Sequence, residues 1–266
     1  MRRRSKFGSI IELFRPAEIV WVGLSIYNMS QTDISTLFEA GSHFGFPRAR
    51  RHPTASPFLF GTKDRTDIFD LELTEKSLET AKAFVTAVAA SGKQVLFVGG
   101  KHEAITTVKE EAERAGAPYV AGRWIGGTLT NFKNIRKRLD LLDKRMKERE
   151  SGELEKYTKK ERLLIDRQIE ELLARFGGLV TMTELPAALF VIDSRHENTA
   201  VLEANQLKIP VIGLSSSDCD FNLVQYPIPA NDTSVRSIRL VAEAIADAYQ
   251  DGKKAKIDAP KAPAQA

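Results

Sequence analysis

The segment DSRHE, residues 193–197, holds the side-chain types used in acid–base catalysis and directly follows an apolar run. A carboxylate and an imidazole, here Asp193 and His196, can pass a proton when the fold holds them together. The alternative is a polar loop that caps the helix expected over residues 196–207. No second group of reactive residues supports a reaction, so the sequence favours the polar loop.

Two glycine pairs are candidates for a phosphate cradle. Gly99-Gly100 lies in VGGKHEA, between an expected strand and an expected helix, and Gly126-Gly127 lies in GRWIGGTLTNF. Neither pair matches G-x-G-x-x-G or G-x-x-x-x-G-K-[ST], the spacings that fit backbone amides around a nucleotide phosphate. A tight strand-to-helix turn explains Gly99-Gly100 equally simply. A nucleotide-dependent α/β enzyme using Lys101 and Asp193 stays open as the rival class.

Metal ligation has little support in the sequence. The four histidines (His43, His52, His102 and His196) and the single cysteine, Cys219, show no C-x-x-C or H-x-x-x-H spacing. Structural zinc sites depend on such clustered ligands. One cysteine cannot form an intrachain disulfide, so the fold does not require an oxidising compartment. We expect no catalytic residues, no cofactor and no metal.

The basic residues are concentrated rather than spread evenly. The stretch 47–65 has one acidic residue, Asp64, against five basic ones: Arg48, Arg50, Arg51, Lys63 and Arg65. Aromatic rings and histidines are interleaved with them. Arginine forks suit phosphate oxygens, and planar groups can stack on unpaired bases. The stretch therefore reads as a candidate RNA-binding loop, with a merely solvated basic loop as the alternative.

A second basic group begins after an expected strand. Arg123 and Trp124 precede the glycine pair, and further basic residues follow at the start of a helix: Lys133, Arg136 and Lys137. A helix N-terminus and its free amides favour an anion. The alternatives are core packing for Trp124 and an ordinary solvated helix face for the lysines and arginine. We expect these residues, with Lys101, to contribute to RNA binding.

Composition narrows the class of protein. The chain has 266 residues and a net charge of +4, with 42% hydrophobic and 28% charged residues. Its isoelectric point is about 9.1, a mild lean toward polyanions. No run of 18 apolar residues occurs, so we expect a globular protein with no membrane span.

Apolar runs alternate with helical periodicity along most of the chain. Strands are expected near 66–71, 94–100, 117–120, 188–193, 210–214 and, weakly, 224–228. Helices are expected at 33–40, from a cap at Thr74 to 90, and at 103–116, 196–207 and 233–250. This alternation predicts an α/β fold with a mostly parallel sheet and helices on both faces.

Residues 129–177 interrupt the alternation. Apolar residues recur at spacings of three and four from Phe132 to Met146, and again from Ile165 to Phe176. Such narrow seams are typical of coiled coils. Thr158 and Glu161 match a capping box. The segment is predicted to be an antiparallel coiled-coil hairpin that projects from the sheet domain.

The two ends differ from the middle. Residues 1–28 are predicted to be an extension outside the core, because charged residues and Pro16 break any signal-like apolar segment. Residues 251–266 are rich in Ala, Pro and Lys and are expected to be disordered. The α/β domain is then discontinuous, formed by 29–128 and 178–250.

Six segments resemble one known family and occur in its order. They are FEAGSHFGF, FGTKDRTDIFDLELT, GRWIGGTLTNFKNIR, VTMTELPAALFVIDSRHE, EANQLKIPVIGL and YPIPANDTSVRSIRL. Together they are similar to the bacterial ribosomal protein S2 family of the small subunit, from about Met29 to about Tyr249.

This resemblance implies a Rossmann-like α/β domain with a coiled-coil hairpin and a structural role without catalysis. It also implies binding to small-subunit rRNA in cytoplasmic ribosomes, beside neighbouring small-subunit proteins. The family lies between the head and the body of the subunit and helps to dock ribosomal protein S1. A protein-docking platform is thus a further reading of the hairpin.

The chain departs from the family pattern at four places. The family's usual H-F-G-H corresponds to His43–Phe46, where phenylalanine replaces the second histidine. The usual R-R-W-N-P is replaced by RRHPT, which begins at Arg50. V-G-T-K reads VGGK, ending at Lys101. The loop usually written D-T-N-x-D-P is SSSDCDF from Ser215, which changes its polar groups.

Overall fold

The computed structural model describes residues 33–258. The chain divides into two units, Met1–Gln31 and Thr32–Ala266, and the account below concerns the second. The predicted extension over residues 1–28 lies outside the described residues, as do residues 259–266 of the predicted tail.

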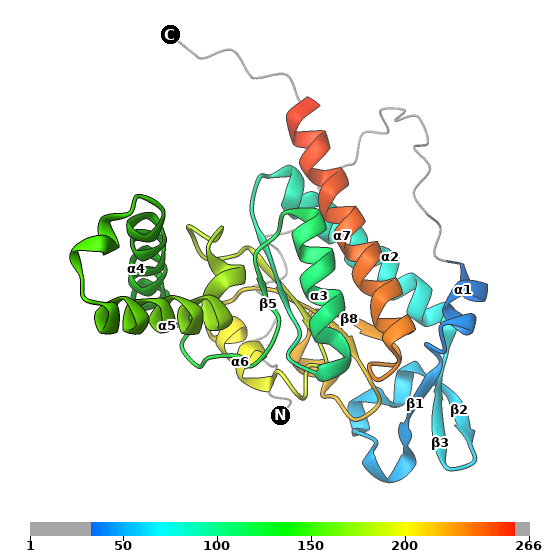
Figure 1. Ribbon diagram of the computed structural model, residues 1–266. Coiled ribbons are helices and arrows are strands. Elements are labelled where there is room, and N and C mark those ends of the chain that lie inside the picture. Colours follow the sequence, from blue (N-terminus) through cyan, green and yellow to red (C-terminus); the bar gives the residue numbers. More distant parts are fainter. Residues whose placement is uncertain (1–32, 259–266) are drawn as a thin grey trace, which may run out of the picture. The chain divides into compact units, whose positions relative to one another are not determined.

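The centre of the described unit is a five-stranded parallel sheet (Figure 1). Its spatial order is β5-β4-β6-β7-β8, and its strands are β4 (Val95–Val98), β5 (Tyr119–Val120), β6 (Ala188–Ile192), β7 (Val211–Ser215) and β8 (Tyr226–Pro229). Every residue of β4, β6 and β7 is buried. Strands covered on both faces carry continuous apolar runs, and this is why the sequence located them.

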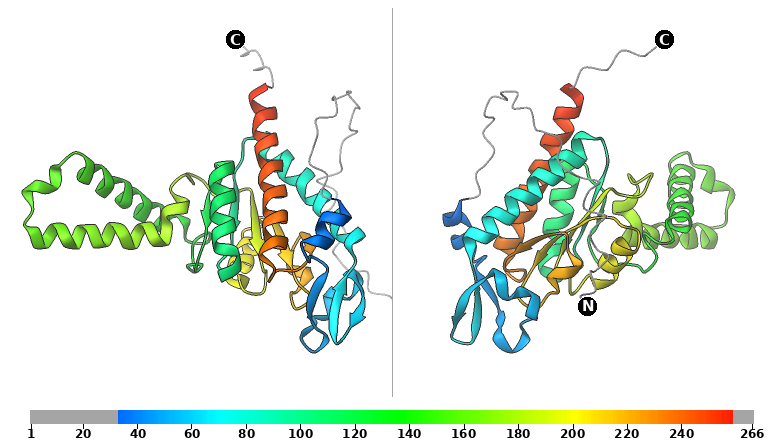
Figure 2. Two further views of the ribbon diagram at one scale, coloured as in Figure 1. Left: turned by 45° about the vertical axis from the view of Figure 1, so that its right-hand side comes forward. Right: turned by 180° about the vertical axis from the view of Figure 1, so that it is seen from behind.

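Alternate residues of each strand point to opposite faces, and each face has its own helices (Figures 1 and 2). Val95, Phe97 and Phe190 pack in one cluster with residues of three helices. These are α2 (Leu71–Ala90), α3 (His102–Ala115) and α7 (Val235–Asp258).

On the opposite face, Leu96, Val98 and Leu189 share a cluster with α6 (Asn198–Gln206). The same cluster includes Leu129 and Ile135 at the start of the helix pair described below. The predicted mostly parallel sheet with helices on both faces is therefore confirmed.

The edge strand β8 contains Pro227 and Pro229, which explains its weak sequence signal. Proline lacks the amide hydrogen that a central strand needs. Here only β7 pairs with β8, in parallel, with Gly213 opposite Pro227. The unpaired side of the strand therefore tolerates both prolines.

The expectation of a loop over residues 43–65 is corrected by a second, small sheet. Three antiparallel strands in the order β1-β3-β2 form it: β1 (Phe44–Pro47), β2 (Leu59–Lys63) and β3 (Thr66–Phe69). Two short 3-10 turns, η2 (Arg48–Arg50) and η3 (Pro53–Phe58), connect β1 to β2. The strands are short and only partly buried, so they lack the apolar runs of the main sheet.

Most predicted helix boundaries agree with the structure to within two residues. Helix α1 (Ile34–Glu39) ends before Gly41, whose φ of +72° suits glycine. Helix α2 begins earlier than predicted, because Asp70 rather than Thr74 caps it. The Thr74 hydroxyl is buried and instead donates to the Pro229 carbonyl at 2.6 Å. Helix α7 extends to Asp258, so residues 251–258 are helical rather than part of a tail.

Residues 129–177 contain two helices, α4 (Phe132–Glu150) and α5 (Lys159–Phe176). A short 3-10 turn, η4 (Glu153–Lys156), lies between them. The capping box is present, since Thr158 and Glu161 exchange hydrogen bonds. The predicted seam residues are buried or partly buried, among them Leu139, Leu142, Ile169 and Leu172. The seam therefore extends the cluster on the α6 face of the sheet.

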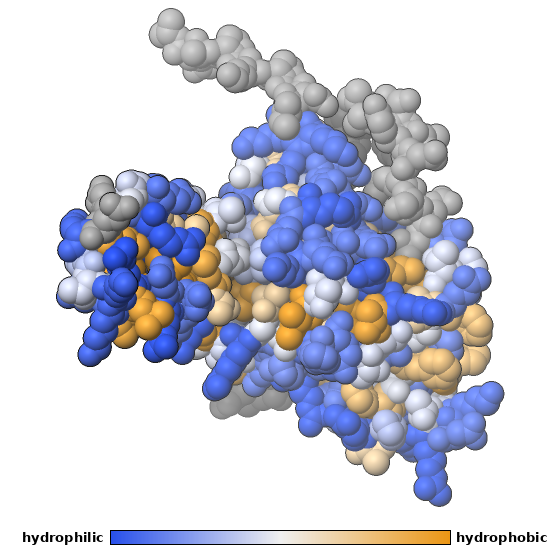
Figure 3. All heavy atoms as spheres, in the orientation of Figure 1, coloured by the Kyte–Doolittle hydropathy of each residue, from blue (hydrophilic) through white to orange (hydrophobic). Residues whose placement is uncertain are grey.

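Charged and polar residues cover most of the visible face over α3 and α7 (Figure 3). Across residues 33–258, no helix combines the length and apolarity that crossing a bilayer would require.

Candidate functional site

The strand order creates a switch point at the carboxyl edge of the main sheet. The chain leaves β4 toward β5 on one side and reaches β6 on the other. In open parallel sheets, ligands bind at this point, between the loops that follow the two strands. Here those loops are Gly99–Lys101 and Asp193–Glu197, the two candidate segments of the sequence.

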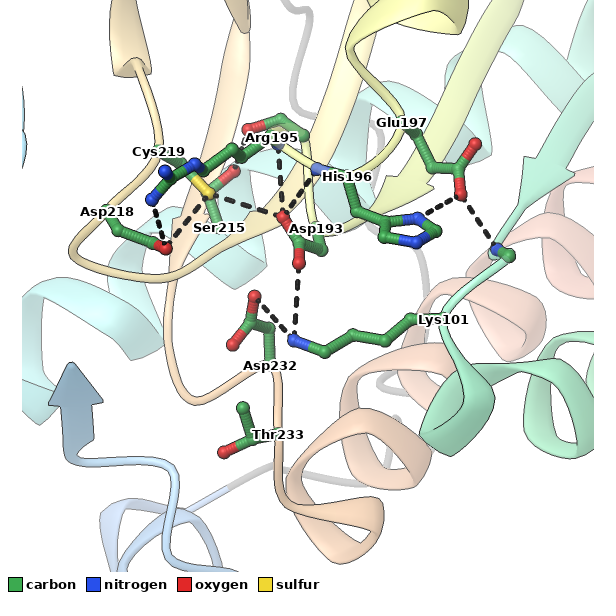
Figure 4. A network of polar contacts seen from close by, with 12 residues as sticks. Lys101, Asp193, Arg195, His196, Glu197, Ser215, Asp218, Cys219, Asp232 and Thr233 are labelled. Atoms are coloured by element: carbon green, nitrogen blue, oxygen red, sulfur yellow. Dashed lines mark hydrogen bonds and ion pairs between the residues drawn. The ribbon is translucent and has the colours of Figure 1, made fainter. Parts of the chain in front are cut away.

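A buried ion cluster fills one part of the switch point (Figure 4). The Lys101 ammonium lies 3.2 Å from a carboxylate oxygen of Asp193 and 3.2 Å from one of Asp232. Asp232 follows β8, so the cluster joins three strand ends. The Lys101 side chain is 16% exposed, and its ammonium is shared between these two carboxylates.

The pKa values follow from these contacts. Burial lowers the pKa of Lys101, but Asp232 and Asp193 outweigh burial and raise it overall. Burial raises the pKa of Asp193, but the His196 amide and Lys101 outweigh it and hold that pKa below its usual value. Burial and the neighbouring Asp193 raise the pKa of Asp232 to about 7. Asp193 is therefore held in its ionised form beside the Lys101 ammonium, whereas Asp232 takes up a proton more readily than an ordinary aspartate.

Asp193, Cys219 and Asp232 place ligand atoms within 4.8 Å of one another. The Lys101 ammonium already supplies the positive charge among them. Burial raises the pKa of the Cys219 thiol to about 12, and Asp193 adds to this effect, so the sulfur keeps its proton.

The second part of the switch point is occupied by Glu197. Its buried carboxylate accepts the Gly100 amide at 3.0 Å and lies 2.7 Å from the His196 Nδ1 (Figure 4). A Cβ at Gly100 would come within 2.5 Å of both Glu197 and the Gly122 carbonyl, so glycine is required there. The amide that would bind a nucleotide phosphate is therefore already used. Asp193 accepts the amides of Arg195 and His196 and so holds a polar loop, as expected, but no side chain of residues 33–258 caps α6, so the expected capping role is wrong.

An open pocket of about 580 Å³ lies beside these groups, lined by Gly100, Arg123, Trp124, His196 and Glu197 among others. Arg123 and His196 are exposed there. The Arg123 guanidinium is a positive charge of this pocket that can reach an incoming anion.

Trp124 belongs to the core. Its indole NH donates to Glu203 at 3.1 Å, and its side chain packs in the cluster with Leu129. Glu203 is 8% exposed and also accepts from Gly127 N, Leu129 N, Thr130 N and the Thr130 hydroxyl. These five hydrogen bonds fold the GRWIGGTLT segment, so Trp124 positions the loop and is not free to stack on a base.

The small sheet presents the first predicted basic group. Arg48, Lys63 and Arg65 are exposed, and Arg65 lies with Asp64 at the β2–β3 turn, where both have positive φ. Arg51 differs, because its guanidinium forms a bidentate ion pair with Asp67, whose carboxylate is fully buried. Arg51 therefore holds the small sheet together.

Arg50 reaches across to the main sheet. It lies 3.1 Å from an Asp218 carboxylate oxygen, and Arg195 lies 2.7 Å from the same oxygen. Sequence reasoning included Arg50 among the RNA contacts but missed Arg195. Arg195 could have been found from its position in the sequence, because it follows a predicted buried strand and so lies at the carboxyl edge of the parallel sheet.

The second predicted basic group lies on α4. Lys133 and Lys137 are exposed. Arg136 is half-buried, pairs with Asp140 at 3.0 Å and donates to the Met182 carbonyl at 3.1 Å. The exposed members of the predicted set thus form separate groups on the small sheet, at the switch point and on α4. Arg51, Lys101 and Arg136 are half-buried, and Trp124 is buried.

Comparisons with known proteins give one consistent result. A family model described as Ribosomal protein S2 matches residues 37–252. The chain is 46% identical to small ribosomal subunit protein uS2 of Roseiflexus sp., over 82% of this chain and 83% of that protein. It is 42% identical to the protein of the same name from Syntrophobacter fumaroxidans, over 85% and 82%. It is 43% identical to small ribosomal subunit protein uS2 of Chloroherpeton thalassium, over 84% of this chain and 89% of that protein.

Proposed function

The chain belongs to the ribosomal protein S2 family, and from this premise we propose how it binds the small-subunit rRNA. Members of this family are structural components of the small ribosomal subunit and not enzymes, so the resemblance seen in the sequence is confirmed. The nucleotide-enzyme reading is set aside, consistent with a switch point whose lysine and glycine amide are already engaged.

The proposal rests on exposed basic side chains that form no ion pair within residues 33–258. They lie in three places: at the small sheet, at the pocket beside the switch point and on α4. They are Arg48, Lys63, Arg65, Arg123, Lys133 and Lys137. Such side chains can neutralise phosphates without first breaking an internal contact. Surface cations held by rigid elements can follow the shape of folded RNA.

Four other predicted residues act by positioning. Arg51 holds the small sheet through Asp67, and Arg136 anchors α4 through Asp140 and the Met182 carbonyl. Lys101 and Trp124 hold the loops after β4 and β5. Removing any of them would affect RNA binding indirectly, by moving the exposed cations.

We further propose that α4 and α5 act as a coiled-coil hairpin that reaches beyond the sheet domain. The seam spacing and the burial of Leu139, Leu142 and Ile169 support it. In this arrangement Lys133 and Lys137 lie on the outer side of the seam. The hairpin would hold these charges at a fixed distance from the small sheet.

Protein partners are proposed on a second observation. Leu163 and Leu164 of α5 are 51% and 54% exposed, which is unusual for adjacent leucines on a charged helix. We propose that they contact neighbouring small-subunit proteins, with ribosomal protein S1 docking through the same chain, in cytoplasmic ribosomes. Binding of such a protein in the absence of RNA separates this role from RNA binding.

The test of RNA binding is the salt dependence of affinity for small-subunit rRNA. If the six exposed side chains each neutralise a phosphate, affinity should fall on the order of 10³-fold between 50 and 200 mM salt. Changing Lys133 and Lys137 together to glutamine should lower the slope of log affinity against log salt by roughly 1.4–1.8. Lys109→Gln, an exposed lysine on α3, is the matched control and should leave the slope unchanged. A salt-independent affinity would refute the proposal.

A further inference from the structure

Asp218 brings together two arginines from distant parts of the chain. Arg50 comes from the turn after β1, and Arg195 comes from the loop after β6. Both guanidinium groups contact the same Asp218 oxygen, at 3.1 and 2.7 Å. Figure 4 shows Arg195 beside Asp218 at the edge of the ion cluster.

The charge at this place is unbalanced. The Asp218 side chain is 4% exposed, whereas Arg50 and Arg195 are 54% and 57% exposed. One buried carboxylate therefore holds two guanidinium groups that face solvent, which leaves an excess positive charge. Each guanidinium has five N–H donors, and the Asp218 oxygen takes one from each, so several remain for an outside acceptor.

Both arginines are held before any ligand arrives. The Arg50 guanidinium lies 4.3 Å from the centre of the Phe46 ring, which fixes its plane. The backbone amides of Arg195 and His196 donate to the buried Asp193 carboxylate at 3.1 and 3.0 Å. A pair of prearranged arginine forks suits a tetrahedral anion better than two freely moving side chains would.

The basic surface continues from this pair toward the switch-point pocket. His196 follows Arg195 in the chain and lines the pocket together with Arg123. On the other side, Arg48 lies exposed in the same short turn as Arg50. A row of side chains thus runs from the small sheet along the carboxyl edge of the main sheet. In order, these are Arg48, Arg50, Arg195, His196 and Arg123.

We propose that Arg50 and Arg195 form a phosphate clamp for the RNA backbone, and that the bound strand continues past His196 to Arg123. The proposal rests on the proposed function and adds to it a residue that the sequence did not indicate, Arg195. The ligand is a phosphodiester of the RNA, because the proposed partner is a polyanion and the arginines come from separate elements along one edge. Asp218 is a positioning residue in this site.

The experiment measures binding of the full chain to small-subunit rRNA as salt is varied, for wild type and three variants. Arg195→Ala should weaken binding roughly tenfold, the loss expected for one charge-assisted contact, and should lower the salt slope by about 0.7–0.9. Arg195→Lys keeps the charge but not the fork, so it should keep the slope and recover part of the affinity. Arg239→Ala, an exposed arginine of α7 paired with Glu110, is the control and should match wild type.

Thermal unfolding of each variant separates a lost contact from a damaged fold. Asp218 keeps Arg50 as a partner when Arg195 is removed, so the melting temperature of Arg195→Ala should stay close to that of wild type. Wild-type affinity and slope in Arg195→Ala would overturn the clamp while leaving the proposed function intact. Normal RNA binding combined with loss of a neighbouring ribosomal protein would also overturn it, in favour of a protein contact. If wild-type protein showed no salt-dependent binding to small-subunit rRNA, both proposals would be wrong.

Discussion

Buried carboxylates determine the shape of this protein's surface loops. Asp193, Glu197, Asp218 and Glu203 each accept backbone amides or basic side chains from another part of the chain. A carboxylate out of water is stable only when such donors surround it. The exposed Arg123 and Arg195 therefore lie on loops that buried carboxylates hold in place.

Glu203 provides the first prediction at this scale. Replacing it by alanine leaves the Trp124 indole and the Leu129 amide buried without an acceptor. We expect a loss of about 3 kcal/mol in the free energy of unfolding, since each buried unpaired donor costs roughly 1–3 kcal/mol. For a chain of this size the melting temperature should fall by about 6–12 °C. Leu202→Ala, the exposed neighbour, should change it little. Equal effects of the two substitutions would contradict the role of Glu203.

Glu203 should also affect how the free energy of unfolding changes with pH under acidic conditions. Burial raises the pKa of Glu203, but the amides of Gly127 and Thr130, with the Trp124 indole, outweigh it and hold the pKa below its ordinary 4.5. Its contribution is thus present above its unfolded-state pKa and is lost as pH falls through the lower folded value. Glu203→Gln keeps one acceptor and removes the titration, so its stability should depend less on pH below about 4.5.

Of these carboxylates, the sequence placed only Asp193 in a polar loop, and the distant partners of Glu197, Asp218 and Glu203 were not predicted. Glu203 bonds to residues 73–79 positions away, and Asp218 pairs with an arginine 168 positions away. Spacing rules describe neighbours on one element, not partners brought together by the fold. What the sequence did show at the residue scale was the concentration of exposed basic residues, which depends on composition alone.

At the scale of helices and strands, the extent to which a strand is buried determines whether its sequence identifies it. Strands β4, β6 and β7 are covered on both faces and have apolar sequences that identify them. In the small sheet, the strand predicted near 66–71 is confirmed as β3. The sequence did not indicate β1 and β2, because these strands are short, partly exposed and interrupted by Gly45 and Gly61. The seam of α4 and α5 was visible from its three–four spacing, since local periodicity needs no tertiary information.

The seam gives a prediction for α5. Ile169 is fully buried, and Ile169→Ala should cost about 2–5 kcal/mol by removing contacts and leaving a cavity. Amide hydrogen exchange should then speed up across α4 and α5 more than in α2 and α7, which lie on the other face of the sheet. Leu163→Ala on the same helix, at an exposed position, should leave exchange near wild type. Equal acceleration in α2 and α7 would show that the helix pair does not open as its own unit.

At the scale of the whole molecule, a rigid α/β body presents separate groups of cations to one large anionic partner. The main sheet and its helices supply the stable frame, and the small sheet, the switch-point pocket and α4 carry the basic side chains. A net charge of only +4 is compatible with this role because the charge is concentrated.

The most direct test of the central claim is sedimentation of the cellular protein through a density gradient. We predict that the chain migrates with small ribosomal subunits at low salt. A combined variant lacking the charges of Arg48, Lys63, Arg65, Arg123, Lys133 and Lys137 should shift toward the light fractions while keeping the wild-type melting temperature. Wild-type protein found only in the light fractions would contradict the account, and so would undiminished co-migration of the combined variant with small subunits.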